Sequence, residues 1–187
     1  MENQLEKYPM PKEEELLAIL PESGMAGENG TRIIARRAAF WVPNCVSYVL
    51  RYYAAREGRT LALIKKAHFA RIRGMVGRRK AGQNARRNLT VMLAPWLILV
   101  PTQVREADGE RGTLGYVNAS RPVQLAPLSE GRAKSALTLA NGMRIASFWT
   151  VERNEAHLSY GDYLHVCMLL RLRARLQEEE RLMAASF

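Results

Sequence analysis

The residue types best suited to chemistry in this sequence gather in one short run, from Arg78 to Asn88. Arginine and lysine donate hydrogen bonds to guanine O6 and N7, and glutamine and asparagine pair with adenine. Four such side chains are spaced as on one face of a helix and are predicted to read base edges: Lys80, Gln83, Asn84 and Arg87. Three neighbouring arginines are predicted to hold phosphate oxygens instead: Arg78, Arg79 and Arg86.

Catalytic chemistry finds little support in the rest of the chain. His68 has no carboxylate or thiol at a useful interval, and His157 and His165 stand too far apart to share one helix face. Cys45 and Cys167 are isolated, so the usual zinc spacings are missing. There is no P-loop, no nucleophile elbow and no pair of carboxylates in the basic part of the chain. The sequence therefore predicts a protein that is not an enzyme and needs no cofactor or metal ion.

Positive charge is concentrated in one part of the chain, residues 31–87, which we call the basic segment. The formal net charge of +10 is the sum of −5 over residues 1–30, +14 over the basic segment and +1 over residues 88–187. Such an excess indicates an anionic partner, with nucleic acid expected first and an acidic membrane surface second. Charge that serves only solubility is the alternative, although it would be spread more evenly.

Composition predicts a globular, cytoplasmic and nucleoid-associated protein of one substantial or two small domains. The 187 residues are 48% hydrophobic and 25% charged. The first seven residues are too polar for a signal peptide. The most apolar run, Leu89–Val100, is interrupted by Pro95 and is shorter than the roughly 20 residues that a membrane span needs. Both cysteines are expected to be buried, reduced thiols.

Elements in the first half of the chain are predicted to be helical. Helical spacing and capping residues favour four helices, namely Lys12–Leu20 (ended by Pro21), a helix capped by Thr31 that extends to Ala38, Asn44–Arg56, and Leu61 to about Met75. Residues 22–30 are rich in Gly and acidic side chains and are expected to form a loop.

A further helix over residues 79–94 is predicted to be basic at its start and apolar at its end. Pro95 stops it, and a β-hairpin follows, with one strand over 96–104, a turn at Asp108-Gly109 and a return strand over 113–117. Residues 118–143 are expected to be irregular, and 143–151 suits helix or strand equally. An amphipathic helix is predicted over 160–183.

Helices followed by a two-stranded wing are the order of a winged helix-turn-helix domain. The expected fold is therefore mainly α with a small β-hairpin, divided into an acidic arm (1–30), a winged-helix DNA-binding domain (31–120), an irregular connection (121–159) and a C-terminal helix (160–187). The wing would offer Arg105 and Arg111 to the backbone or minor groove. A second cluster is expected to add phosphate contacts: Lys65, Lys66, Arg71 and Arg73.

The run from Arg78 to Val117 resembles the winged-helix segment of replication proteins carried by integrative conjugative elements, pathogenicity islands and plasmids. The resembling parts are the basic helix 78–93, the strand 96–100, the stretch 104–109, the return through 114–117, and the later Asp162-Tyr163-Leu164. The resemblance implies a DNA-binding protein of a bacterial mobile element, acting in replication, copy control or transcription.

Three functions from different classes remain open at this point. The first is sequence-directed binding of duplex DNA, with the C-terminal helix available for a homodimer or a protein partner. The second is a non-catalytic subunit that holds RNA or single strands, which would use aromatic residues among the basic ones for stacking: Tyr48, Tyr52, Tyr53 and Phe69. The third is a module whose basic face docks on an acidic protein.

Overall fold

The computed structural model describes residues 4–24, 27–80, 89–104, 114–129 and 131–184, which form a mixed α/β fold. The α-helices of these residues are α1 (Val46–Arg56), α2 (Leu61–Lys80) and α4 (Val151–Ala184). Two short 3-10 helices precede the first strand, η1 (Gln4–Lys7) and η2 (Glu13–Glu15). No helix among the described residues is long and apolar enough to span a membrane.

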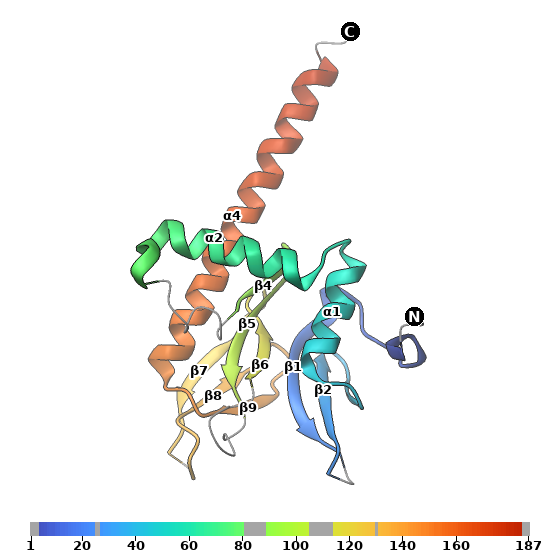
Figure 1. The fold of residues 1–187 in the computed structure, drawn as a ribbon, viewed down its shortest axis with the longest axis vertical. Helices are drawn as coiled ribbons and strands as arrows, with labels where there is room; N and C mark the ends of the chain where they lie inside the picture. The colour runs from blue at the N-terminus through green and yellow to red at the C-terminus, as the bar shows by residue number, and fades with distance from the viewer. Residues whose placement is uncertain (1–3, 25–26, 81–88, 105–113, 130, 185–187) are drawn as a thin grey trace.

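A six-stranded antiparallel sheet forms the centre of the molecule (Figure 1). Its strands are β1 (Leu16–Ser23), β2 (Asn29–Ala35), β3 (Ala39–Val42), β4 (Val91–Ala94), β5 (Leu97–Gln103) and β6 (Leu114–Asn118). They lie in the order β3-β2-β1-β6-β5-β4. The sheet therefore joins two meanders through the β1–β6 pair, in which Ala18 lies opposite Val117.

A smaller antiparallel sheet of three strands packs on one face of the first. Its strands are β7 (Gln124–Pro127), β8 (Ser135–Thr138) and β9 (Arg144–Ser147), in the order β7-β8-β9. Residues from both sheets share one apolar cluster: Leu17, Ala18, Leu20, Ile34 and Val117 from the larger sheet, with Leu137, Leu139 and Ile145 from the smaller one and its turn.

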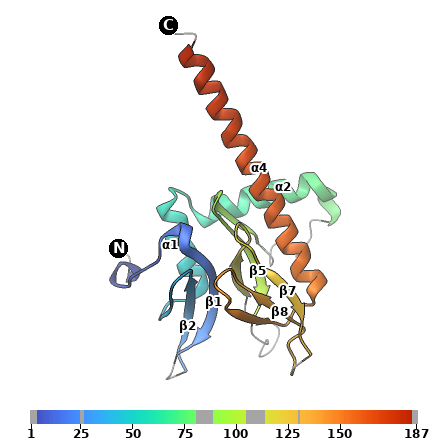
Figure 2. The ribbon, with the colours of Figure 1, turned by 180° about the vertical axis from the view of Figure 1, so that it is seen from behind.

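Helices α1 and α2 pack on the face of the larger sheet opposite the smaller sheet, whereas α4 packs on the same face as the smaller sheet. A second apolar cluster joins α1 to this sheet, with Tyr53 completely buried against residues such as Leu16 and Ile33. The helix α2 lies against β4, and α4 lies against β5 and β7. Figures 1 and 2 show the C-terminal part of α4 leaving the body of the molecule and pointing away from it.

The expected fold class, mainly α with a winged helix, is wrong. Most of residues 16–42 form strands, because the apolar run at Leu16–Leu20 lies in β1 and the stretch after Thr31 lies in β2. Both of these strands bury side chains on two faces, since Ile33 belongs to one apolar cluster and its neighbour Ile34 to the other. A strand buried on both faces shows no alternation of apolar and polar residues, so its pattern resembles that of a short helix.

The predicted recognition helix over residues 79–94 is also wrong. The helix α2 ends at Lys80, residues 81–88 lie outside the described part of the chain, and Val91–Ala94 is the strand β4. The hairpin after it is confirmed as an antiparallel β5–β6 pair. It is no wing, however, because β5 and β6 are interior strands of the six-stranded sheet.

Other elements agree more closely with the predictions made from the sequence. The helix predicted over Asn44–Arg56 is confirmed as α1, and the one that starts at Leu61 is confirmed as α2, which is longer than expected. The C-terminal helix is confirmed and begins earlier, at Val151. The stretch expected to be irregular contains β7 and β8, and the ambiguous stretch that follows forms β9 and the start of α4.

Candidate nucleic-acid interface

The helix α2 begins after a tight connection from α1. Gly58 adopts a positive φ of 63°, a conformation that glycine reaches without a steric penalty. The hydroxyl of Thr60 then accepts a hydrogen bond of 3.3 Å from the backbone N–H of Leu63, which caps the first turn of α2. Gly58 therefore marks the end of α1, and Thr60 caps the start of α2.

One side of α2 packs on the protein and the other faces solvent. Ile64 and His68 are buried, one helical turn apart. Lys65 and Lys66 lie on the opposite side and are exposed. Neither lysine has a hydrogen bond or an ion pair within the described part of the chain. Their ammonium groups are therefore available to an anionic partner.

The whole of α2 carries positive charge without compensation. Its twenty residues contain seven Lys or Arg and no acidic residue. The described side chains include three of the predicted phosphate contacts: Lys65, Lys66 and Arg71. The helix α2 also contains four further cationic residues whose side chains the structure does not describe: Arg73, Arg78, Arg79 and Lys80. The remaining predicted contacts lie outside the described residues altogether: Gln83, Asn84, Arg86, Arg87, Arg105 and Arg111.

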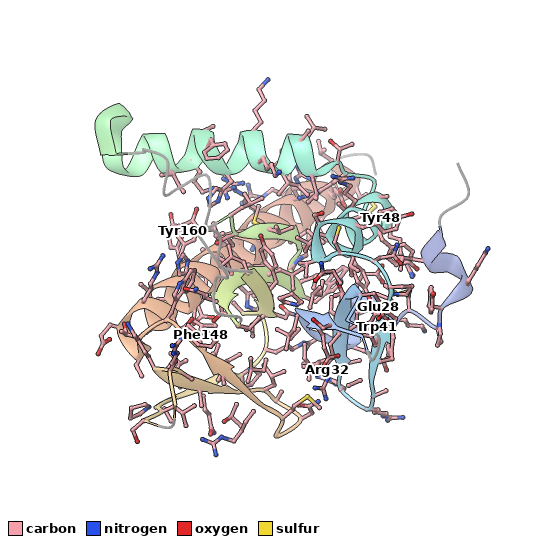
Figure 3. The ribbon with its side chains drawn as sticks, turned by 60° about the horizontal axis from the view of Figure 1, so that its bottom comes forward. Glu28, Arg32, Trp41, Tyr48, Phe148 and Tyr160 are labelled. Carbon is pink, nitrogen blue, oxygen red and sulfur yellow. The ribbon has the colours of Figure 1, made fainter. Side chains whose placement is uncertain are left out.

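Several other cations of the basic segment form ion pairs or hydrogen bonds within the protein. Arg56 Nε lies 2.7 Å from Glu13 Oε1, and its guanidinium also donates to the Tyr52 hydroxyl at 3.1 Å. Arg59 donates a 3.2 Å hydrogen bond to a carbonyl of β4. Arg32 pairs with a glutamate of β1 at 3.5 Å, and in Figure 3 it lies far from α2. The sequence could not separate these cations from the unpaired ones, because both kinds look alike in a charge count.

A seam of aromatic side chains holds α2 against α4. The rings of His68 and Tyr160 lie 6.1 Å apart, and Figure 3 shows Tyr160 beneath α2. Tyr160 in turn stacks with Tyr163 at 6.5 Å. The charge of Arg71 acts on both His68 and Tyr163, so this half-buried arginine lies on the α4 side of α2. Of the three predicted phosphate contacts whose side chains the structure describes, Arg71 is therefore the least available to a partner.

His68 is neutral in this seam. Burial, reinforced by the nearby charge of Arg71, lowers the pKa of its imidazole to about 4. Both ring nitrogens are buried and find no hydrogen-bond partner among the described residues, and the same holds for the Tyr160 hydroxyl. Burial likewise lowers the pKa of His157, one turn before Tyr160, to about 4. The sequence offered no sign that His68 and His157 have lowered pKa values.

The aromatic residues of the basic segment belong mainly to the core. Tyr53 is completely buried and donates a 3.2 Å hydrogen bond to the Pro11 carbonyl. Tyr52 is 9% exposed, and Tyr48 and Phe69 are half-buried. None of these four rings is fully exposed, unlike the rings on which single-strand binders stack bases.

Groups that could support catalysis or bind a metal are sparse. The described residues contain no cluster of three His, Cys, Asp or Glu side chains with metal-binding geometry. A surface hollow of about 330 Å³ is lined by Ser120, Asp162 and His165 among others. The Ser120 hydroxyl is buried there without a hydrogen-bond partner among the described residues, so it is not in contact with His165 as a nucleophile would be with its base.

The cysteines differ from expectation. Cys45 is exposed beside the first turn of α1, where its thiol contacts the Ser47 hydroxyl at 3.1 Å. That hydrogen bond is the main cause of a lowered thiol pKa. Cys167 is half-buried on α4. The prediction of two buried thiols is therefore wrong for Cys45.

No protein-family model, curated protein or solved structure matches this chain.

Proposed function

We propose that this chain binds double-stranded DNA through the outer face of α2 and the basic run that follows it. The observation that carries the proposal is the charge of α2: seven cations and no acid over twenty residues, with Lys65 and Lys66 exposed and unpaired among the described residues. Phosphate contacts from such side chains supply most of the affinity in sequence-independent binding to DNA.

The packing of α2 supports a rigid contact surface. The helix is about 30 Å long at 1.5 Å per residue, comparable to one turn of duplex DNA. Ile64 and His68 fix its inner side against β4 and α4, so the outer side is held in one orientation. A helix that is already held in one orientation loses little conformational entropy of its own when its cations bind the phosphates of a duplex.

Sequence-directed recognition is proposed for the residues after α2. The run begins at Lys80, the last residue of α2, and continues with Gln83, Asn84 and Arg87. These side chain types match the hydrogen-bonding groups of the major groove. The winged-helix arrangement does not apply to them, so the proposal does not extend to replication, copy control or transcription in a mobile element.

Duplex DNA is favoured over RNA loops or single strands because of the aromatic residues. Proteins that hold single strands stack bases on exposed rings between their cations. In the described part of the basic segment, the four candidate rings are buried or half-buried. A docking module for acidic proteins would share the cations but would have no preference for a duplex.

The test is fluorescence anisotropy with a random duplex, a single DNA strand and an RNA hairpin, from about 50 to 200 mM salt. A linear fall of log affinity with log salt, together with preference for the duplex, is expected. Absence of binding at low salt, or binding that ignores salt, contradicts the proposal. Equal affinity for an acidic polypeptide of similar length would favour the protein-docking function instead.

A further inference from the structure

The last half of α4 is not buried by any other part of the molecule that the structure describes. From Leu169 to Ala184 every residue is exposed. Figures 1 and 2 show this part of the helix extending beyond the body from both sides. Isolated helices of about 12–15 residues are only marginally stable in water, and most helical stability comes from packing of an apolar face. A partner for this segment would supply that packing.

The segment exposes many large apolar side chains. Six of them are between 43% and 62% exposed: Leu169, Leu170, Leu172, Leu176, Leu182 and Met183. Leu169, Leu172, Leu176 and Met183 follow one another at intervals of three, four and seven residues. These intervals place the four side chains along one stripe, as in the seam of a two-helix coiled coil, with Glu179 at the remaining position of that seam.

Charges on the segment are arranged in two blocks of opposite sign. Three arginines come first, at 171, 173 and 175, three glutamates follow, at 178, 179 and 180, and a single arginine, Arg181, comes after these two blocks. Within the described part of the chain none of the six residues in the blocks forms an ion pair. The order of the two blocks opposes the helix dipole, which favours acidic residues toward the N-terminus and basic residues toward the C-terminus. Only the single Arg181, in the last turn, is placed as the dipole favours. The helix by itself therefore gains little from this arrangement.

We propose that the last half of α4 pairs antiparallel with the same segment of a second copy, centred near Leu176. Antiparallel pairing places the arginine block of each copy opposite the glutamate block of the other, and it also sets the two helix dipoles in the favourable opposed orientation. Parallel pairing would instead bring arginines against arginines and glutamates against glutamates. The charge order on the helix thus selects a second copy in one orientation. The pairing is independent of nucleic acid and gives a two-fold dimer with the two bodies at opposite ends.

The test measures the mass of the nucleic-acid-free full chain by sedimentation velocity and light scattering. The wild-type protein is expected at twice the 21.1 kDa of one chain, and added salt should weaken the dimer. The double variant Arg173→Glu, Arg175→Glu gives the segment a net charge of −3, from five glutamates and two arginines, and Glu178→Arg, Glu180→Arg gives it +5, from six arginines and one glutamate. Each should be monomeric alone, an equimolar mixture should form a heterodimer, and the four changes combined should restore the homodimer.

A matched control reverses the same number of charges elsewhere. Arg36→Glu with Arg37→Glu alters two exposed residues of the β2–β3 turn and should leave the dimer intact. Circular dichroism on each variant shows whether the fold is retained, and heterodimer formation shows that both α4 variants remain competent to pair. A monomeric wild type, a dimer that either α4 double variant leaves unchanged, or a dimer that salt strengthens would overturn the proposal.

Discussion

The Thr102 hydroxyl donates a 2.8 Å hydrogen bond to Oδ1 of Asn154, which joins β5 of the large sheet to the first turn of α4. The amide nitrogen of Asn154 donates to Ser135 Oγ at 2.9 Å and to Ser147 Oγ at 3.0 Å, both in the small sheet. Ser135 donates onward to the Trp149 carbonyl at 2.7 Å. One buried side chain therefore ties both sheets to the helix whose far end leaves the body.

Replacement of Asn154 by alanine is expected to lower the free energy of unfolding by about 2–4 kcal/mol, because it removes the partners of several buried hydroxyls. Urea denaturation followed by circular dichroism measures the change. The matched control is Glu155→Ala, one residue later and exposed, which should have little effect. Similar losses for both variants would show that the network does not stabilise the fold.

At Gly161 the helix α4 packs directly against the large sheet. A Cβ atom there would lie 2.5 Å from the Ala119 Cβ and 2.8 Å from the Val100 Cγ1. Gly161→Val should therefore destabilise the protein by about 1–3 kcal/mol through overpacking. Ser159→Val places the same side chain at an exposed position of the same helix and isolates the cost of helix propensity. Thermal unfolding midpoints that shift equally in the two variants would contradict the close packing.

Stability should depend on pH through His68. Its pKa is about 4 in the folded protein, against an ordinary value of 6.5, so the unfolded chain takes up a proton first as the pH falls. The stabilisation from the neutral imidazole is complete above pH 6.5 and is lost as the pH falls toward 4, by on the order of 2–3 kcal/mol. His68→Phe should flatten this decline in urea denaturation at pH 7.5 and 4.5. His157 acts in the same direction, so part of the slope should remain.

DNA affinity should depend on the exposed lysines of α2. Lys65→Ala with Lys66→Ala is expected to weaken binding to all duplex sequences alike and to reduce the salt slope by about 2, roughly one unit for each phosphate contact. Arg36→Ala with Arg37→Ala removes equal charge from the β2–β3 turn and should change the slope less. Anisotropy titrations at several salt concentrations give both slopes, and equal reductions would mean that α2 is not the contact surface.

The local sequence pattern was sufficient to predict some of the helices and strands of this molecule. The helices α1, α2 and α4 and the strand β5 follow from periodicity and capping residues, because these signals act over a few residues. The distribution of charge along the chain also follows from the sequence alone, because the net charge of +14 on the basic segment is a property of its composition. Thr60 and Gly58 mark a helix start and stop in any fold.

Only the tertiary structure decided which apolar runs are strands and which cations are unpaired. Strand β1 is a strand because β2 and β6 pair with its two edges, and the side chain of Asn118 donates to the Leu16 carbonyl from 102 residues away. Arg56 is paired because Glu13 of the N-terminal arm reaches it. Such contacts depend on distant parts of the chain, so no window of sequence around Leu16 or Arg56 contains them. Distant parts of the chain also bury both faces of the large sheet. This is why β1 and β2 do not alternate apolar and polar residues.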